Sequence, residues 1–257
     1  MIIDIESSDE KGILFTNNDE NLDKNSISSQ SEDLDDVDVI IFNTCAVREN
    51  AQNKVSGMLG RVKHAKEKNP NLITIFGGCM AQEESVVLEI KDKYKWIDVV
   101  MGTHNIYKFA ELLCISLASD RMIIDIWKET DKIVEDLPVF RKYPFKSGVN
   151  IMFGCNNFCT YCIVPYVRGR ERSRNPKDII RECEKLAYDG VKEVMLLGQN
   201  VNSYGLDFKE GDPNRISFPE LLEEVSKVKG IERVRFMTPH PKDFSDELLE
   251  TIAKNPK

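Results

Sequence analysis

The chain has 257 residues, of which 41% are hydrophobic and 30% charged, and its formal net charge is −8 at pH 7. This composition supports one large or two ordinary folded domains. No apolar run approaches the roughly 18–20 residues of a membrane span, and the first residues lack the pattern of a signal peptide. We therefore expect neither a membrane protein nor a secreted precursor.

The negative charge is concentrated at the amino end of the chain. Residues 1–38 hold 12 acidic and two basic residues, which leaves 31 acidic and 33 basic residues, a net charge of +2, for 39–257. Residues 1–36 are rich in Ser, Asn, Asp and Glu, so we predict a disordered acidic leader with room for a short strand at 12–16. The remaining chain is free to bind a polyanion.

From residue 37 onward, short apolar runs alternate with segments whose apolar residues recur at helical spacing. The predicted strands are 37–42, 72–76 and 97–101, and the predicted helices are about 47–69, 82–94 and 107–117. Strands that alternate with helices favour a parallel sheet with right-handed crossovers. We therefore predict an α/β domain at 37–120.

An isolated strand is expected at 122–127, inside a linker at 121–146 that contains Pro138 and Pro144. A second alternating region follows at 147–257. Its predicted strands are 149–153, 193–197 and 233–237, and its predicted helices are about 176–188, 218–228 and 245–253. Pro176 suits the first turn of a helix, and Ser245 is a plausible N-cap.

Three of the seven cysteines form a tight group directly after the strand at 149–153. Cys155, Cys159 and Cys162 have the spacing C-x3-C-x2-C. Three thiolates from one loop can hold a 4Fe–4S cluster by three irons and leave the fourth iron open to a ligand. By spacing alone, a zinc site completed by a distant Cys or His, or inert thiols, remain alternatives.

This segment resembles the cluster loop of the radical SAM superfamily. The resemblance implies that Cys155, Cys159 and Cys162 bind a 4Fe–4S cluster and that S-adenosylmethionine (SAM) binds its open iron. The residues that it places near SAM are Tyr161, beside the adenine, and Gly198, Gln199 and Asn200, beside the methionine group. For the last three, a plain β-to-α turn is an equal alternative.

Four longer segments resemble the methylthiotransferase family, and more narrowly its MiaB-type tRNA branch. They are 43–51 (NTCAVRENA), 77–82 (GGCMAQ), 162–174 (CIVPYVRGRERSR) and 197–205 (LGQNVNSYG). The resemblance covers about residue 37 to the end. It implies addition of a methylthio group to carbon 2 of N6-isopentenyladenosine at position 37 of tRNA, beside the anticodon.

Cys45 and Cys79 each follow a predicted strand, at the carboxyl edge where open α/β sheets place their sites. The family uses three N-terminal cysteines for an auxiliary 4Fe–4S cluster, and Cys45 and Cys79 match two of them. Residues 1–36 contain no cysteine. Cys114 and Cys183 lie in helical apolar patterns, so we expect both to be buried structural thiols rather than a replacement ligand.

The resemblance also implies a partial (β/α)6 radical SAM barrel followed by a small TRAM domain. Only about three β/α units and no TRAM domain are present, so we expect a chain truncated at both ends. The predicted domains are thus a leader at 1–36, a partial methylthiotransferase domain at 37–120, a linker at 121–146 and a partial barrel at 147–257.

Residues 141–181 carry nine bases and two acids around the cysteine loop. Such a patch binds phosphates, and aromatic side chains nearby can stack a splayed base. The RNA-binding candidates are Arg168, Arg170, Arg172 and Arg174. A solvated face, or arginines paired with the SAM carboxylate and barrel acids, is an equal reading for any single one. His240, after the strand at 233–237, could face the barrel mouth, but a structural role is favoured.

We therefore predict a cytoplasmic, monomeric radical SAM enzyme that uses SAM, one 4Fe–4S cluster and a second, auxiliary cluster for which this chain offers two of the three ligands. Its expected partners are the tRNA anticodon loop and an electron donor such as flavodoxin or ferredoxin, with no membrane. The alternatives are an inactive Fe–S- or RNA-binding fragment, and a sister methylthiotransferase acting on a ribosomal protein or threonylcarbamoyl-adenosine.

Overall fold

The computed structural model describes residues 12–17, 37–46, 49–137, 141 and 143–257. The contacts among residues divide the chain into two compact units. The N-terminal unit comprises Asp4–Thr130 and Thr160–Arg168, and the C-terminal unit comprises Asp131–Cys159 and Gly169–Lys257. Among the helices of the described ranges, none is long and apolar enough to cross a membrane. Most of the predicted leader lies outside these ranges.

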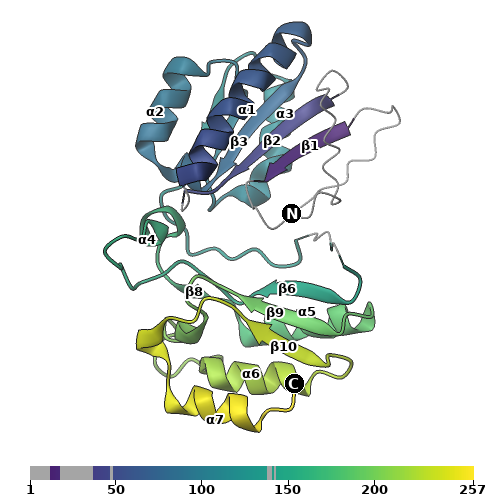
Figure 1. The fold of residues 1–257 in the computed structure, drawn as a ribbon, viewed down its shortest axis with the longest axis vertical. Helices are drawn as coiled ribbons and strands as arrows, with labels where there is room; N and C mark the ends of the chain where they lie inside the picture. Colours follow the sequence, from purple (N-terminus) through teal and green to yellow (C-terminus); the bar gives the residue numbers. More distant parts are fainter. Residues whose placement is uncertain (1–11, 18–36, 47–48, 138–140, 142) are drawn as a thin grey trace. The chain divides into compact units, whose positions relative to one another are not determined.

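The N-terminal unit is built on a five-stranded parallel sheet whose spatial order, β1-β2-β3-β4-β5, follows the chain (Figure 1). The strands are β1 (Gly12–Asn17), β2 (Val37–Thr44), β3 (Ile73–Gly78), β4 (Val99–Met101) and β5 (Ile123–Asp125). The helices are α1 (Glu49–Lys68), α2 (Glu84–Lys93) and α3 (Phe109–Leu117), with short 3-10 turns η1 (Cys79–Gln82) and η2 (Ile106–Lys108). The predicted α/β class is confirmed.

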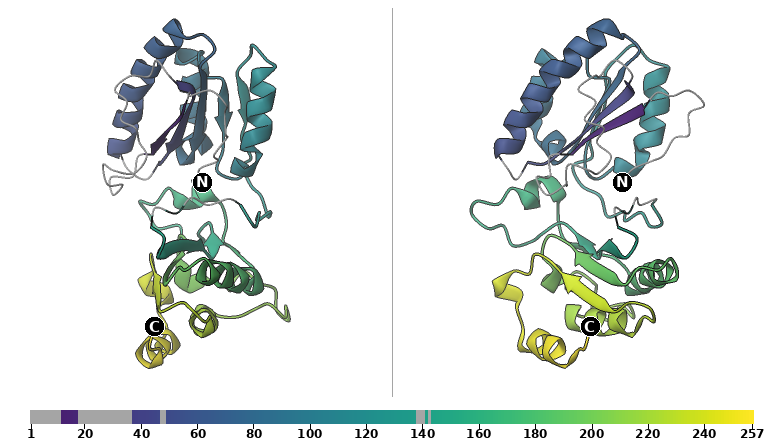
Figure 2. Two further views of the ribbon diagram at one scale, coloured as in Figure 1. Left: turned by 90° about the vertical axis from the view of Figure 1, so that its right-hand side faces the viewer. Right: turned by 45° about the vertical axis from the view of Figure 1, so that its right-hand side comes forward.

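Helices cover both faces of this sheet. Buried side chains of α1 and α2 pack against one face in a single core, which includes Ile40, Phe42 and Val100. Strand residues whose side chains point to the other face of the sheet, such as Ile41 and Ile75, are also buried. Figure 2 shows α3 on this second face. Burial on both faces explains why these strands read as continuous apolar runs.

The expectation of an isolated strand at 122–127 is wrong. After α3 the chain runs parallel to β4, with Val99 opposite Ile123, so β5 becomes the fifth strand of the sheet. Cys114 is also not a buried thiol. Helix α3 buries Phe109, Leu112, Leu113 and Ser116, and this spacing turns Cys114 toward solvent.

The C-terminal unit contains a three-stranded parallel sheet of order β10-β9-β6 and a two-stranded antiparallel pair, β7 with β8. The strands are β6 (Lys146–Asn150), β7 (Met152–Phe153), β8 (Arg172–Ser173), β9 (Glu193–Leu197) and β10 (Arg233–Phe236). The helices are α5 (Pro176–Tyr188), α6 (Phe218–Lys227) and α7 (Asp246–Lys254), with 3-10 turns η3 (Val201–Ser203) and η4 (Pro241–Asp243). The segment Thr160–Arg168 carries α4 (Val164–Arg168).

The strand predicted at 149–153 is divided in two. At Ile151 the backbone N–H donates to Leu197 O at 2.8 Å, while the carbonyl accepts from Arg174 N at 2.9 Å. The chain therefore leaves β9 after this residue and pairs with β8 instead, which sequence periodicity did not predict. The predicted caps are confirmed, since Pro176 lies in the first turn of α5 and Ser245 Oγ accepts from Leu248 N at 3.1 Å.

The predicted burial of Cys183 is confirmed, because its side chain is fully enclosed in the core beneath α5. This burial raises the pKa of the Cys183 thiol from 9.0 to about 12. A raised thiol pKa means that ionisation opposes folding. The contribution of the neutral Cys183 thiol to the free energy of unfolding is therefore fully present below about pH 9, and it is lost as the pH rises toward 12.

In the native protein at pH 8, iodoacetamide is expected to alkylate Cys114 and to spare Cys183. Burial blocks access to Cys183, and its raised pKa lowers the thiolate fraction about a thousandfold. Mass spectrometry of peptides after a short pulse measures both sites, and labelling in urea, where both thiols react, is the control. Comparable native labelling of the two cysteines would contradict this assignment.

Candidate functional site

Three loops meet at the carboxyl edge of the C-terminal sheet. The cysteine loop follows β6 and β7, Gly198–Asn200 follow β9, and His240 follows β10. Because β6, β9 and β10 are parallel neighbours, their carboxyl ends lie at one edge (Figure 1). This is the edge at which parallel α/β folds place ligands and catalytic groups.

The first turn of the cysteine loop depends on Gly154. Its φ is +77°, and a Cβ at this position would collide with the backbone of Arg170 and lie 2.6 Å from Gly169 O. The N–H of Gly154 donates to Gln199 Oε1 at 2.5 Å, and the N–H of Cys155 donates to Gly169 O at 3.1 Å. The loop is thus held by the segment after β9 and by the chain before β8.

None of the three cysteines of this loop forms a disulfide. Cys155 is buried, whereas Cys159 and Cys162 are half-buried. Cys162 lies in Thr160–Arg168, which groups with the N-terminal unit. Within the described ranges, no three His, Cys, Asp or Glu side chains come together as a metal site. The convergence of the three thiols stays a prediction.

A histidine that the sequence did not assign to the site lies beside the second cysteine. His240 Nε2 is 3.4 Å from Cys159 Sγ. The backbone N–H of His240 donates to Asn200 Oδ1 and Asn202 Oδ1, at 3.1 and 2.8 Å. The spacing of 81 residues between His240 and Cys159 gives no local sequence signal.

The residues predicted to bind SAM differ in their surroundings. Gln199 holds Gly154, and Asn200 is buried, with its amide donating to Asp243 Oδ2 at 2.7 Å. Tyr161 is 94% exposed, so its ring has an accessible face. A role of Gly198, Gln199, Asn200 and Tyr161 in SAM binding stays a prediction.

A second pair of thiols lies at the carboxyl edge of the N-terminal sheet. Cys45 and Cys79 directly follow Thr44 and Gly78, which are paired neighbours on β2 and β3. Gly78 has φ of +96°, and a Cβ there would lie 2.7 Å from Thr44 N. Only glycine permits this approach of the two strand ends. Among the residues that the structure describes, no third His, Cys, Asp or Glu side chain joins this pair as a metal site.

Of the four arginines proposed for RNA, Arg174 has surroundings that favour the other reading given for these residues, an arginine paired with acidic side chains. It is only 7% exposed and pairs with Glu135 and Glu182. Burial opposes its charge, but the two carboxylates outweigh burial and raise the pKa of Arg174. The two carboxylates enclose the guanidinium, which favours a structural role over contact with a phosphate.

The other three arginines have different neighbours. Arg168 Nε donates to Cys79 Sγ at 3.1 Å, within the N-terminal unit. Arg170 lies over the ring of Phe158 at 4.8 Å, and Arg172 lies over the ring of Phe153 at 5.9 Å. Cation–π stacking of this kind leaves a guanidinium edge able to meet a phosphate. RNA contact by these three residues stays a prediction.

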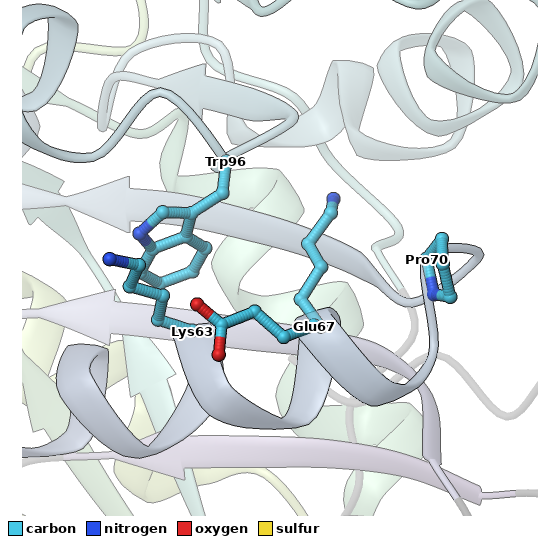
Figure 3. Close-up of a pocket in the computed structure, with 5 residues that line it drawn as sticks. Lys63, Glu67, Pro70 and Trp96 are labelled. Atoms are coloured by element: carbon cyan, nitrogen blue, oxygen red, sulfur yellow. The ribbon is translucent and has the colours of Figure 1, made fainter.

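A pocket of about 270 Å³ lies in the N-terminal unit (Figure 3). Its lining residues are Lys63, Lys66, Glu67, Pro70 and Trp96. They come from the end of α1 and from the segments just before β3 and β4, at the amino end of the strands. The cysteines lie at the opposite end, so the pocket is separate from the thiol pair.

Two family models match the chain. Residues 18–102 match the uncharacterized protein family UPF0004, and residues 149–257 match the radical SAM superfamily. The first match begins inside the segment predicted as a leader. The domain boundaries proposed from the sequence stay predictions.

The chain is similar to several proteins named tRNA-2-methylthio-N(6)-dimethylallyladenosine synthase. It is 56% identical to that of Lachnoclostridium phytofermentans over 88% of this chain and 48% of the relative. It is 55% identical to that of Clostridioides difficile over 85% of this chain and 45% of the relative. The chain thus spans about half the length of the curated relatives that it matches.

Among solved structures, the chain resembles the radical S-adenosylmethionine methyltransferase TsrM from Kitasatospora setae, determined with cobalamin and a 4Fe–4S cluster bound. The TM-score is 0.54 with 14% identity, over 84% of this chain and 46% of TsrM. At this identity the likeness concerns the fold alone.

Proposed function

The chain belongs to the radical SAM methylthiotransferase family, and we propose that it acts as a tRNA methylthiotransferase. In this proposal it adds a methylthio group to carbon 2 of N6-isopentenyladenosine at position 37 of tRNA. The observation that carries the proposal is the identity of about 55% to synthases of that name along 85–88% of this chain. Neither alternative proposed from the sequence is favoured by a specific observation.

The ligand atoms that this chain offers are suited to one iron–sulfur cluster. Cys155, Cys159 and Cys162 offer three free thiols from one loop, and Gly154 gives that loop a turn in which a Cβ has no room. When bound by these thiols, a 4Fe–4S cluster supplies the electron for reductive cleavage of SAM. The N-terminal pair, Cys45 and Cys79, is one thiol short of the family's auxiliary site, so we assign it no step.

The chain's own residues position the substrates. In our proposal, the arginines stacked on Phe158 and Phe153 receive the phosphates of the anticodon loop. Tyr161 keeps its proposed place beside the adenine of SAM. The segment Gly198–Asn200 lies beside the cysteine loop, where the methionine group of SAM would bind. We further propose that the protein is a cytoplasmic monomer reduced by flavodoxin or ferredoxin.

Anaerobic reconstitution tests this proposal through the cysteine loop. The intact chain is expected to bind about four irons at this loop, to give a 4Fe–4S electron paramagnetic resonance (EPR) signal on reduction, and to cleave SAM. Replacing Cys155, Cys159 and Cys162 together by alanine is expected to abolish all three. Cys114→Ala is the matched control, because this thiol is exposed and outside the loop.

The substrate is tested in a strain that lacks the endogenous tRNA methylthiotransferase. Expression of the chain is expected to restore the methylthio-adenosine nucleoside in tRNA digests, measured by mass spectrometry. A cluster signal that survives the triple substitution would sink the assignment of the ligands. SAM cleavage without the tRNA product would instead point to a sister methylthiotransferase, whereas a chain that binds iron but cleaves no SAM would point to an inactive fragment.

A further inference from the structure

His240 is placed to act on a cluster-binding thiol. Its ring lies at the carboxyl edge of the C-terminal sheet, after β10, and Nε2 is 3.4 Å from Cys159 Sγ. This separation is within the range of a hydrogen bond to sulfur. Both residues belong to the C-terminal unit.

The hydrogen bonds around the ring define which nitrogen carries the proton. The backbone N–H of Lys242 donates to His240 Nδ1 at 3.2 Å, so Nδ1 is an acceptor. A neutral imidazole has one donor and one acceptor nitrogen, and the proton therefore lies on Nε2. The N–H of Nε2 faces the sulfur of Cys159, which accepts.

The position of His240 is set by the segment after β9. Besides accepting its N–H, Asn202 donates from Nδ2 to His240 O at 2.8 Å. The amide of Asn200 is anchored to Asp243, whose carboxylate also accepts from Asn157 of the cysteine loop at 3.4 Å. The ring and the loop are thus tied to one network, and little freedom remains for the N–H to turn away from the thiol.

We propose that His240 is a positioning residue for the radical SAM cluster, donating an Nε2–H hydrogen bond to the Cys159 sulfur and thereby making the cluster easier to reduce. Hydrogen bonds to cluster sulfurs favour the more negative, reduced state, and neighbours of metal ligands also orient them. This inference rests on the proposed function, because it takes Cys159 as a cluster ligand.

Redox titration of the reconstituted chain, followed by EPR, tests the proposal. His240→Phe keeps a planar ring but removes the donor, and it is expected to shift the reduction equilibrium about tenfold toward the oxidised cluster, or about 59 mV for one electron. His240→Gln, which retains an N–H at similar reach, is expected to recover part of this shift. His64→Phe is the control, because His64 is an exposed residue of the N-terminal unit that contacts Glu67.

The same midpoint potential in the intact chain, His240→Phe and His64→Phe would overturn the proposal. A merely structural role for His240 would lower iron content or stability in both His240 variants without the recovery by glutamine. That outcome would also count against the proposal.

A second measurement does not need the cluster. In the metal-free, reduced chain, long-range proton–nitrogen NMR of labelled histidines is expected to show His240 with its proton on Nε2. Cys159→Ala is expected to shift this Nε2–H signal and to leave the His64 signals unchanged. A proton on Nδ1, or no response to Cys159→Ala, would overturn the proposal. If the intact chain binds no iron while the NMR result holds, the proposed function fails separately.

Discussion

Replacing Arg174 by methionine is expected to lower the free energy of unfolding of the C-terminal unit by about 3 kcal/mol. Arg174 Nε donates to Glu135 Oε1 at 2.9 Å, and a guanidinium nitrogen lies 2.8 Å from Glu182 Oε2. Methionine fills much of the space but leaves both carboxylates without their cation. The expected loss lies at the lower end of the range for buried pairs, because both carboxylates keep some contact with water.

Denaturant unfolding followed by circular dichroism measures this loss. Arg181→Met, on the following helix α5, is the matched control, since Arg181 is half-exposed and its pair with Asp178 lies at the surface. We expect Arg181→Met to change the unfolding free energy by less than about 1 kcal/mol. Equal effects of the two substitutions would show that the buried pair around Arg174 is not what stabilises the unit.

Gly154→Ala is expected to prevent iron binding by the cysteine loop, so that reconstitution yields less than one of the about four irons of a cluster at this site. The added Cβ would meet the Arg170 backbone at a residue whose φ is +77°. Relief requires the loop to move away from β8, which displaces Cys155 one residue later. Iron analysis and thermal unfolding of the reconstituted chain check the prediction.

Gly211→Ala is the control that separates the effect of backbone strain at a positive φ from the effect of a steric collision of the added Cβ. Gly211 also has a positive φ, +83°, but a Cβ there meets no atom within 4 Å. Gly211→Ala is expected to lower the free energy of unfolding by about 1–2 kcal/mol and to leave the iron content of the reconstituted chain unchanged. If Gly154→Ala binds as much iron as Gly211→Ala, the close packing of this turn is not needed for the site.

The regular elements could be predicted because their signals are local. Strand β9 and helix α5 begin and end at the predicted residues, since an apolar run and a helical period mark each of them. Helix α4 was missed because five residues are too few to show a period. Cys114 was misassigned because an apolar run does not say which side of α3 faces the sheet.

The candidate site could be predicted only where its residues are close in sequence. Cys155, Cys159 and Cys162 form such a group, whereas the partners that define other residues come from distant elements. Glu135, 39 residues before Arg174, turns an apparent phosphate-binding arginine into a buried ion pair. His240 approaches Cys159 only because β10 and β6 lie on either side of β9 in the same sheet.

The carboxylate partners of the basic residues affect how strongly RNA binding would depend on salt concentration. Of the nine bases in 141–181, Arg141, Arg174 and Arg181 already pair with acidic side chains. Binding of RNA displaces mobile counterions only from charges that such partners have not neutralised. If the chain binds tRNA as proposed, the steepness with which added salt weakens binding would therefore reflect fewer positive charges than the sequence contains.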